Sequence, residues 1–453
     1  MTRIVIQNTS ILTLDDKDTF YYPGVIDIRG DKIFSIDSWS QDTVLDHYDG
    51  QTTIIDGVDK LVMPGLVDLH FHTSVAKGYG DDLPLWEYLD RIWYPSIRAL
   101  TPETCRTAAL HSYITALKSG TTTVNDMYRH LDSLASAALQ TGIRAVISND
   151  IALPEHNLDS VADNVQAFHR NNNLGDGRIR VWLGLEWMPL SDAPLLAEIG
   201  RMKKELGIGV HIHLCESRTE IADSIKRFGK RPVEMAYEAG ILGPDCVAAH
   251  CVHLSDNEIR LLAETGTSVS HNAGSNAKLG NGIAKVEDML KEGINIGLGV
   301  DACECHNSTD MFETMKITSF MQRVTLEDAS LGQPSQILRM ATSNGAKALG
   351  IDAGILAIGK KADLILLDLR KDMMFTPLLK EPVEQRRRML ESHLVFGCNG
   401  SAVDTVIVNG KIVVQGRTVL GVDEEQIRKH MDTLFHDLVA SMPAVTSERK
   451  KNS

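Results

Sequence analysis

The arrangement of apolar and polar residues changes twice along the chain. Residues 4–8, 25–29 and 32–36 are short apolar runs rich in β-formers, and Gly30-Asp31 between the last two is typical of a hairpin turn. From residue 61 to residue 356 the pattern changes to strand-like runs that alternate with helical stretches. The first 60 residues are therefore predicted to be β structure, and the next region is predicted to be mixed α/β.

Eight strand-like apolar runs define the middle region. They are Leu61–Leu69, Thr121–Asn125, Ile143–Ser148, Ile179–Leu185, Gly209–Leu214, Val247–His250, Ser268–Ser270 and Ile294–Val300. Helical stretches such as Pro102–Lys118 and Asn257–Glu264 lie between most of them. This repeated order of strand and helix predicts an α/β fold with a (β/α)8 TIM-like barrel.

Strand-like runs return after the middle region. Residues 364–368 are a nearly continuous β run, and residues 405–414 are typical of a hairpin with Asn409-Gly410 at its turn. Because β structure flanks the barrel on both sides in sequence, the two chain ends are expected to form one small β-sandwich. The expected domains are residues 1–60 and 357–421 for the sandwich, 61–356 for the barrel, and 422–453 for a C-terminal helix and tail.

Composition narrows the class of protein. The chain has 453 residues, enough for one large domain and a smaller one, and its net charge of −14 argues against a nucleic acid partner. No segment is long and apolar enough to cross a membrane, and no signal peptide is recognised. The seven cysteines are scattered and odd in number, which disfavours a disulfide framework. A reduced, cytoplasmic enzyme without membrane contact is expected.

Polar residues end several of the predicted strands, where the active site of such a barrel forms. His70 and His72 end the first strand and project to the same side, because alternate residues of a strand share a face. His213 ends the fifth strand, His250 the sixth, and Asp301 the eighth. Three imidazoles and a carboxylate suit one Zn²⁺ ion, with Fe²⁺ as the alternative, and leave an open position for water. Such a metal lowers the pKa of its water toward ~7 and so generates hydroxide.

Glu216 and His211 lie near His213 in sequence and are not counted among the metal ligands. Glu216 follows His213 by three residues, where the chain turns toward the top of the barrel, so it is a candidate proton carrier. His211, on the same strand as His213, is expected to be packed in the core or to lie outside the site.

With these residues in order, the chain resembles the amidohydrolase superfamily, and within it the branch of triazine hydrolases and of nucleoside and base deaminases. The matching segments are residues 64–72, 213–216, 249–254, 275–280, 299–301 and 359–364. The resemblance implies that His70, His72, His213 and Asp301 bind the metal, that Glu216 carries a proton, and that His250 orients the hydroxide. It also implies a homodimer or a homotetramer.

The chemistry of these residues agrees with the implied roles. Asp301 can accept a proton as metal-bound hydroxide forms and attacks an electron-poor ring carbon, Glu216 can protonate the ring nitrogen and then the departing amine, and His250 can stabilise charge on the attacking oxygen. The leading hypothesis is hydrolytic deamination of an aminated aromatic N-heterocycle, namely an aminotriazine, pterin, purine or pyrimidine, with release of ammonia. The alternatives are dechlorination or alkylamine removal from an s-triazine, deamination of an adenosine or S-adenosylhomocysteine-type nucleoside, and an inactive scaffold protein.

Five residues are candidates for contacting a small heterocyclic substrate: Trp86, Glu186, Asn276, Cys305 and His306. Trp86 follows the first strand and would cap the pocket or form an oligomer contact. The fourth strand ends at Glu186 and has no lysine, which favours a single metal over a lysine-bridged pair. Related nucleoside deaminases usually carry a histidine near this place, and a carboxylate there would accept hydrogen bonds from substrate N–H groups or pair with an arginine. Cys305 or His306 is expected to shape the pocket, and Asn276 belongs to the segment 275–280 named above.

Overall fold

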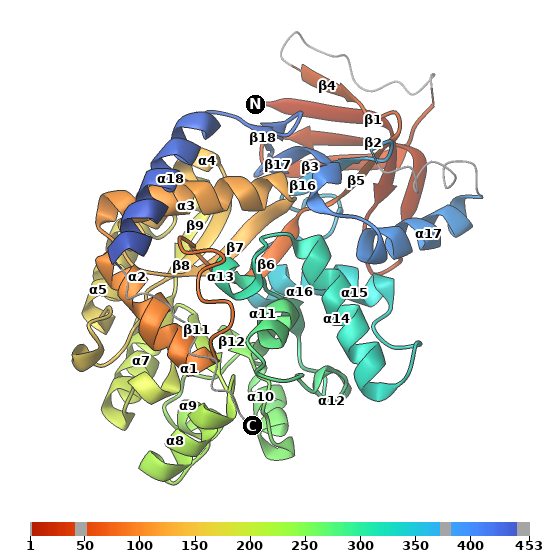
Figure 1. The fold of residues 1–453 in the computed structure, drawn as a ribbon. Coiled ribbons are helices and arrows are strands. Elements are labelled where there is room, and N and C mark those ends of the chain that lie inside the picture. The colour runs from red at the N-terminus through yellow and green to blue at the C-terminus, as the bar shows by residue number, and fades with distance from the viewer. Residues whose placement is uncertain (1, 41–51, 372–381, 442–453) are drawn as a thin grey trace, which may run out of the picture.

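The computed structural model describes residues 2–40, 52–371 and 382–441. In these residues the chain has a mixed α/β fold, with parallel strands and surrounding helices in one part and a large sheet in the other (Figure 1). The predicted tail after residue 441 lies outside the described residues. Among the described helices, none combines the length and the apolar character that a membrane span requires.

Two five-stranded parallel sheets carry the strand ends on which the site was predicted. Their orders are β15-β6-β7-β8-β9 and β10-β11-β12-β13-β14. The strands are β6 (Leu66–His72), β7 (Thr121–Met127), β8 (Arg144–Ser148), β9 (Ile179–Val181), β10 (Leu183–Leu185), β11 (Val210–Leu214), β12 (Cys246–His250), β13 (Ser268–His271), β14 (Ile296–Leu298) and β15 (Asp301–Ala302). Only Trp182 separates β9 from β10, and only Gly299 and Val300 separate β14 from β15. This arrangement is consistent with a TIM-barrel-like domain.

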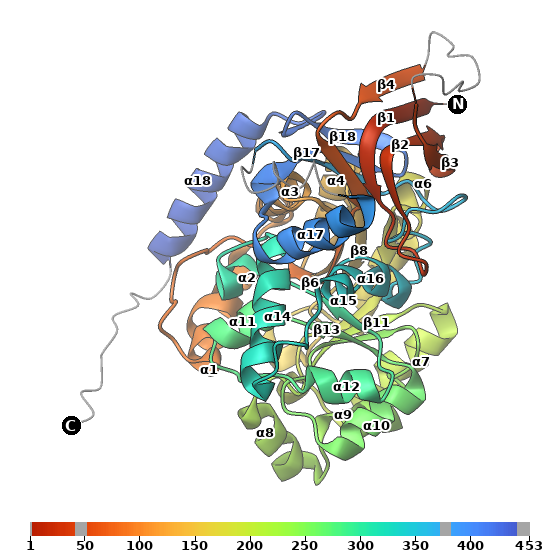
Figure 2. The same cartoon turned by 90° about the vertical axis from the view of Figure 1, so that its right-hand side faces the viewer.

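Helices follow most of these strands and surround them (Figures 1 and 2). They are α1 (Leu85–Tyr88), α2 (Tyr94–Ala99), α3 (Pro102–Lys118), α4 (Leu131–Thr141), α5 (Val161–Asn171), α6 (Leu174–Gly177), α7 (Ala193–Leu206), α8 (Arg218–Phe228), α9 (Pro232–Glu238), α10 (Asp256–Thr265), α11 (Ala273–Lys278), α12 (Val286–Lys291), α13 (Cys303–His306), α14 (Met311–Leu326), α15 (Pro334–Met340), α16 (Ser343–Ala348), α17 (Val383–Phe396) and α18 (Glu424–Ser441). The predicted helix Pro102–Lys118 is confirmed as α3, whose start is fixed by the Thr101 hydroxyl accepting the Thr104 N–H at 3.3 Å. Helix α18 lies along α3, where Lys118 and Glu424 pair at 2.5 Å.

Strands from both chain ends meet in one nine-stranded sheet, which Figure 2 shows at the upper right. The strands are β1 (Arg3–Leu12), β2 (Phe20–Arg29), β3 (Lys32–Ser38), β4 (Thr52–Asp56), β5 (Lys60–Pro64), β16 (Leu364–Asp368), β17 (Val403–Val408), β18 (Lys411–Gln415) and β19 (Thr418–Val419). Both predicted hairpins are present, as β2 with β3 and as β17 with β18. A buried ion pair joins this sheet to β8: Arg144 Nε lies 2.7 Å from Asp363 Oδ2, and Asp363 Oδ1 accepts the Asn409 N–H at 2.6 Å.

The chain passes from the large sheet into the parallel sheets at Gly65. The run expected as one strand over residues 61–69 is two strands, because β5 pairs with β16 in the large sheet and β6 starts afresh after Gly65. A Cβ atom on Gly65 would lie 2.2 Å from the Thr122 side chain, so only glycine fits where the chain passes from one sheet to the other. Six cysteines of the described residues are buried thiols, namely Cys105, Cys215, Cys246, Cys251, Cys303 and Cys305.

Candidate metal centre and active site

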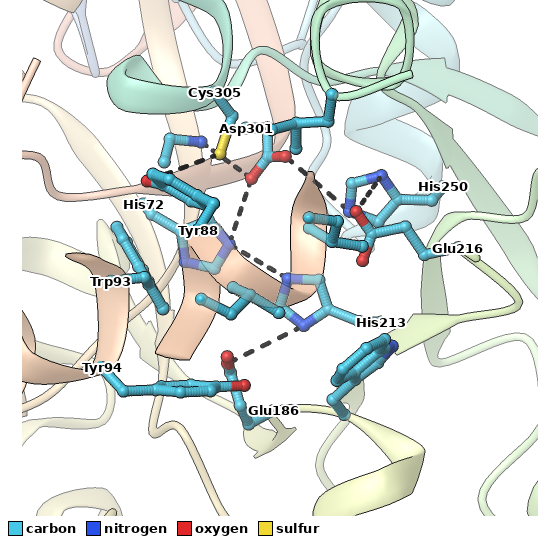
Figure 3. A pocket seen from close by; sticks show the side chains of 15 residues that line it. His72, Tyr88, Trp93, Tyr94, Glu186, His213, Glu216, His250, Asp301 and Cys305 are labelled. Carbon is cyan, nitrogen blue, oxygen red and sulfur yellow. Dashed lines mark hydrogen bonds and ion pairs between the residues drawn. The ribbon is translucent and has the colours of Figure 1, made fainter. Parts of the chain in front are cut away.

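His72, His213, His250 and Asp301 converge at the carboxyl ends of the parallel strands (Figure 3), and His70 lies beside them at the end of β6. Nε2 of His70 and Nε2 of His72 each lie 3.3 Å from Oδ1 of Asp301. Nε2 of His213 lies 3.1 Å from Nε2 of His72. His250 Nε2 lies 3.8 Å from Asp301 Oδ2, and all five side chains are buried.

Ligand atoms of His70, His213, His250 and Asp301 all lie within 4.8 Å of one another. His72 is outside this mutual set, although its Nε2 lies close to both His213 and Asp301. The structure therefore groups three of the four predicted ligands with His250, while the fourth, His72, reaches this set through its contacts with His213 and Asp301.

The polar contacts of these imidazoles test whether the site fits a cation. His72 Nδ1 lies 2.6 Å from the Met127 carbonyl oxygen, to which it can only donate, so its Nε2 carries a lone pair that faces His213. A proton on Nδ1 of His70, donated to Nε2 of His211 at 2.8 Å, leaves Nε2 of His70 without a partner. Burial lowers the pKa of His70 to about 3, so its imidazole is neutral at neutral pH. Several neutral nitrogens and a carboxylate that face one another fit a divalent metal ion.

Asp301 is held in place by its own strand and by α11. The Ser275 hydroxyl donates to its Oδ2 at 2.6 Å, and the Ala302 N–H donates to its Oδ1 at 2.8 Å. Burial raises the pKa of this carboxyl, but the imidazoles around it, above all that of His70, outweigh burial and hold the pKa well below its usual value. Asp301 is therefore a carboxylate at neutral pH.

Glu216 lies beside His250, with 3.9 Å between Oε1 and Nδ1. Asn281 donates from Nδ2 to Oε1 of Glu216 at 2.8 Å. The backbone N–H of Glu216 donates at 2.7 Å to the buried carboxylate of Glu220, which reaches back from the first turn of α8. Burial and the negative charges of Asp301 and Glu186 raise the pKa of Glu216 well above its usual value. Glu216 can therefore hold a proton at neutral pH.

One pocket opens onto these residues, and Figure 3 shows its lining. Its side chains are His72, Leu85, Tyr88, Leu89, Trp93, Tyr94, Glu186, Trp187, His213, Glu216, His250, Leu279, Asp301, Ala302 and Cys305. The wall is mainly aromatic and aliphatic, with the polar groups gathered at the strand ends, as is usual for a small-molecule site.

The five predicted substrate contacts are distributed unevenly around this pocket. Glu186 and Cys305 line it. Trp86 lies outside the lining and packs its ring on Trp187, with centroids 4.5 Å apart. Asn276 stands behind His250, where its Oδ1 lies 2.9 Å from Nδ1 of that histidine. His306 packs closely against Gly274, where an added Cβ would lie 2.2 Å from its ring.

Three residues with a place in the site were not found from the sequence. His211, expected to be packed or outside the site, is buried outside the pocket lining but contacts His70, with 2.8 Å between its Nε2 and His70 Nδ1. The spacing of His211 and His213 is the same as that of His70 and His72, and this signal could have revealed its position. Tyr94 and Asn281 come from α2 and from the loop after α11, away from any strand end, so no comparable signal existed.

Comparison with known proteins gives a consistent picture. The model of the amidohydrolase family matches residues 61–413. A 5'-deoxyadenosine deaminase of Methanosarcina barkeri is 34% identical over 449 residues, which cover 98% of this chain and 100% of that protein. A 5-methylthioadenosine/S-adenosylhomocysteine deaminase of Acetivibrio thermocellus is 38% identical over 433 residues, covering 94% and 97%. A crystal structure of an adenosine deaminase from Xanthomonas campestris with bound zinc has a TM-score of 0.87 at 24% identity, covering 97% and 99% of the two chains.

Proposed function

The chain belongs to the amidohydrolase family, and from this premise we propose that it is a metal-dependent deaminase that hydrolyses the exocyclic amino group of an aromatic N-heterocycle. The observation that carries the proposal is that Glu216, His250 and Asp301 face one pocket together with the imidazoles of His72 and His213. Water and the amino-substituted ring are converted into the hydroxylated ring and ammonia.

An adenosine-type nucleoside is the substrate class that we propose. Two relatives of nearly full-length coverage are named as deaminases of 5'-deoxyadenosine and of 5-methylthioadenosine or S-adenosylhomocysteine. The sequence alone ranked this class behind free aminated heterocycles, because Glu186 stands where related nucleoside deaminases usually have a histidine. A carboxylate at this position is compatible with a nucleoside if it contacts a part of the substrate other than the ring.

His70, His72, His213 and Asp301 would hold the metal, with Zn²⁺ as the first choice and Fe²⁺ as the alternative. A divalent metal in this site supplies the Lewis acidity that makes a water molecule nucleophilic near neutral pH. The donor set supports this role because burial lowers the pKa of His70 and of His213, so both imidazoles are neutral, and His70 Nε2 has no hydrogen-bond partner.

The remaining steps belong to the side chains around the pocket. Asp301 accepts the proton of the attacking water through Oδ2, the oxygen that faces His250 and Ser275. Glu216 protonates the ring nitrogen next to the reacting carbon, takes up the proton of the hydroxyl group added to that carbon, and passes it to the leaving amine, while Asn281 keeps its carboxyl in place. His250 stabilises charge on the oxygen that attacks, with its ring oriented by Asn276.

We also propose a finer account of the fold. The two parallel sheets would close into one (β/α)8 barrel in which β9 with β10 is the fourth strand and β14 with β15 is the eighth. The pairings of β10 with β11 and of β15 with β6 support this closure. The nine-stranded sheet would fold over its own apolar core as a β-sandwich, made of the described residues 2–40, 52–65, 357–371 and 382–421, with 422–441 as the helical part of the C-terminal extension.

The test is ammonia release by zinc-loaded protein. Adenosine, 5'-deoxyadenosine, 5'-methylthioadenosine and S-adenosylhomocysteine are compared with guanine, a pterin, cytosine and an aminotriazine. We expect the highest kcat/KM with an adenosine derivative. Release of ammonia from none of these compounds by protein with a full complement of metal would refute deamination, and chloride release from a chlorotriazine would then favour the alternative reaction.

A further inference from the structure

Glu186 and Tyr94 form an unpartnered polar patch on the wall of the pocket. Oε2 of Glu186 and the hydroxyl of Tyr94 are buried, at 4% and 5% exposure of their residues, and among the described residues neither meets a polar group other than the other one and the buried Asp150 carboxyl, itself without a hydrogen-bond partner. Figure 3 shows the Tyr94 hydroxyl turned toward the Glu186 carboxyl, on the side of His213 away from Asp301. A buried polar atom without a partner costs free energy, so this patch is suited to a ligand that supplies hydrogen bonds.

The position of the patch determines which part of a substrate can reach it. Oε2 of Glu186 lies 3.9 Å from Nδ1 of His213, whose Nε2 faces His72 at 3.1 Å. One imidazole ring therefore separates Glu186 from the group of residues that acts on the amino-bearing carbon. A group bound by Glu186 must belong to a part of the substrate away from that carbon.

The chemistry of the lining determines which kind of group it is. No lysine or arginine lines the pocket, so Glu186 has no cationic partner there and an anionic ligand group would be repelled. A carboxylate needs hydrogen-bond donors. The ring nitrogens N1, N3 and N7 of an adenine nucleoside are acceptors only, and its amino group is at the reacting carbon. In 5'-deoxyadenosine and 5'-methylthioadenosine, the remaining donors are the hydroxyl groups of the sugar.

We infer that Glu186, together with Tyr94, is a specificity-determining residue that binds the ribose hydroxyls of the nucleoside and selects ribonucleosides over 2'-deoxyribonucleosides. This inference rests on the proposed adenosine-type substrate. It explains why a carboxylate at the end of β10 is compatible with a nucleoside, since the sugar and not the ring satisfies it.

The experiment compares 5'-deoxyadenosine with 2',5'-dideoxyadenosine, using the zinc-loaded full chain. Leaving a buried acceptor without its hydrogen bond costs about 1–3 kcal/mol, so kcat/KM should be at least about 10-fold higher for the ribonucleoside. Equal kcat/KM values would overturn the inference and leave deamination intact. If neither compound releases ammonia, deamination of this class is refuted, and binding measured by quenching of tryptophan fluorescence decides the inference: equal binding or no binding overturns it.

Variants separate a role in specificity from a structural role. Glu186→Gln and Tyr94→Phe should bring the ratio of the two kcat/KM values toward one, mainly by lowering the value for the ribonucleoside. Tyr88→Phe is the matched control, because Tyr88 lines the same pocket beside Cys305, with 3.9 Å between its hydroxyl and Sγ. It should change both substrates by the same factor.

Two further results, one with a variant and one with the native protein, would overturn the inference. One is a loss in Glu186→Gln that is equal for both nucleosides while the metal content stays full. The other is efficient hydrolysis of guanine, whose ring carries N–H donors, without hydrolysis of adenine nucleosides, since Glu186 would then contact a ring edge. Metal content is measured for each variant because Glu186 lies near His213.

Discussion

Replacement of Glu216 with glutamine tests the proposed division between proton transfer and metal binding. The amide has nearly the shape of the carboxyl group, and its oxygen can still accept the Asn281 hydrogen bond that is 2.8 Å long in the native protein. It cannot give up a proton to the ring nitrogen. General acid–base catalysis contributes about 10²–10⁴ in rate, so kcat should fall by that factor, which equals about 3–5 kcal/mol of activation free energy.

The assay measures ammonia release and metal content on the same preparations of Glu216→Gln and native protein. Metal should stay at the native level, because Glu216 is not among the proposed ligands. Glu216→Asp is the companion variant: it keeps an acid but shortens the side chain, so its kcat should lie between the two. Loss of metal from Glu216→Gln would show that Glu216 is a ligand, and a loss in kcat smaller than about 10-fold would show that another group transfers the proton.

Three further predictions concern the metal, the join between the sheets and the pH dependence of stability. His213→Ala removes an imidazole whose Nε2 lies 3.1 Å from that of His72, so elemental analysis should find far less than one metal per chain; a full complement would take His213 out of the ligand set. Arg144→Ala leaves the buried Asp363 carboxylate without its cationic partner, so urea denaturation should show a free energy of unfolding lower by about 3–5 kcal/mol, and a loss below about 1 kcal/mol would contradict the importance of the pair. Burial lowers the pKa of His271 from 6.5 to about 4, so the unfolded chain binds the proton first and stability should be lost as the pH falls through this interval. Thermal melts should show a flatter dependence for His271→Gln, and equal slopes would refute this source of the effect.

The strand ends could be predicted because two independent regularities coincide there. Apolar runs locate parallel strands, and parallel strands present their carboxyl ends at one edge, so His70, His72, His213 and Asp301 could be expected together from their positions alone. In the structure, His70 and His72 each lie 3.3 Å from Asp301, and His72 lies 3.1 Å from His213, measured between their nearest ring nitrogens and carboxylate oxygen. Their roles as ligands stay a prediction.

The remaining parts of the site depend on contacts between segments that have no such regularity. Tyr94 reaches the pocket from a short helix after the first strand, and Asn281 reaches Glu216 from a loop, so neither follows from strand periodicity. The break between β5 and β6 depends on the close approach of Gly65 to Thr122, a contact between different strands. Periodicity within one strand predicts a face, whereas these features need the packing of the whole domain.

The most direct test of the proposed function is ammonia release from 5'-deoxyadenosine by protein whose metal has first been removed and then restored. The account predicts no release without metal, and restored release that saturates at one Zn²⁺ per chain. Undiminished release by metal-free protein, or no release from any adenosine derivative at full metal content, would contradict it.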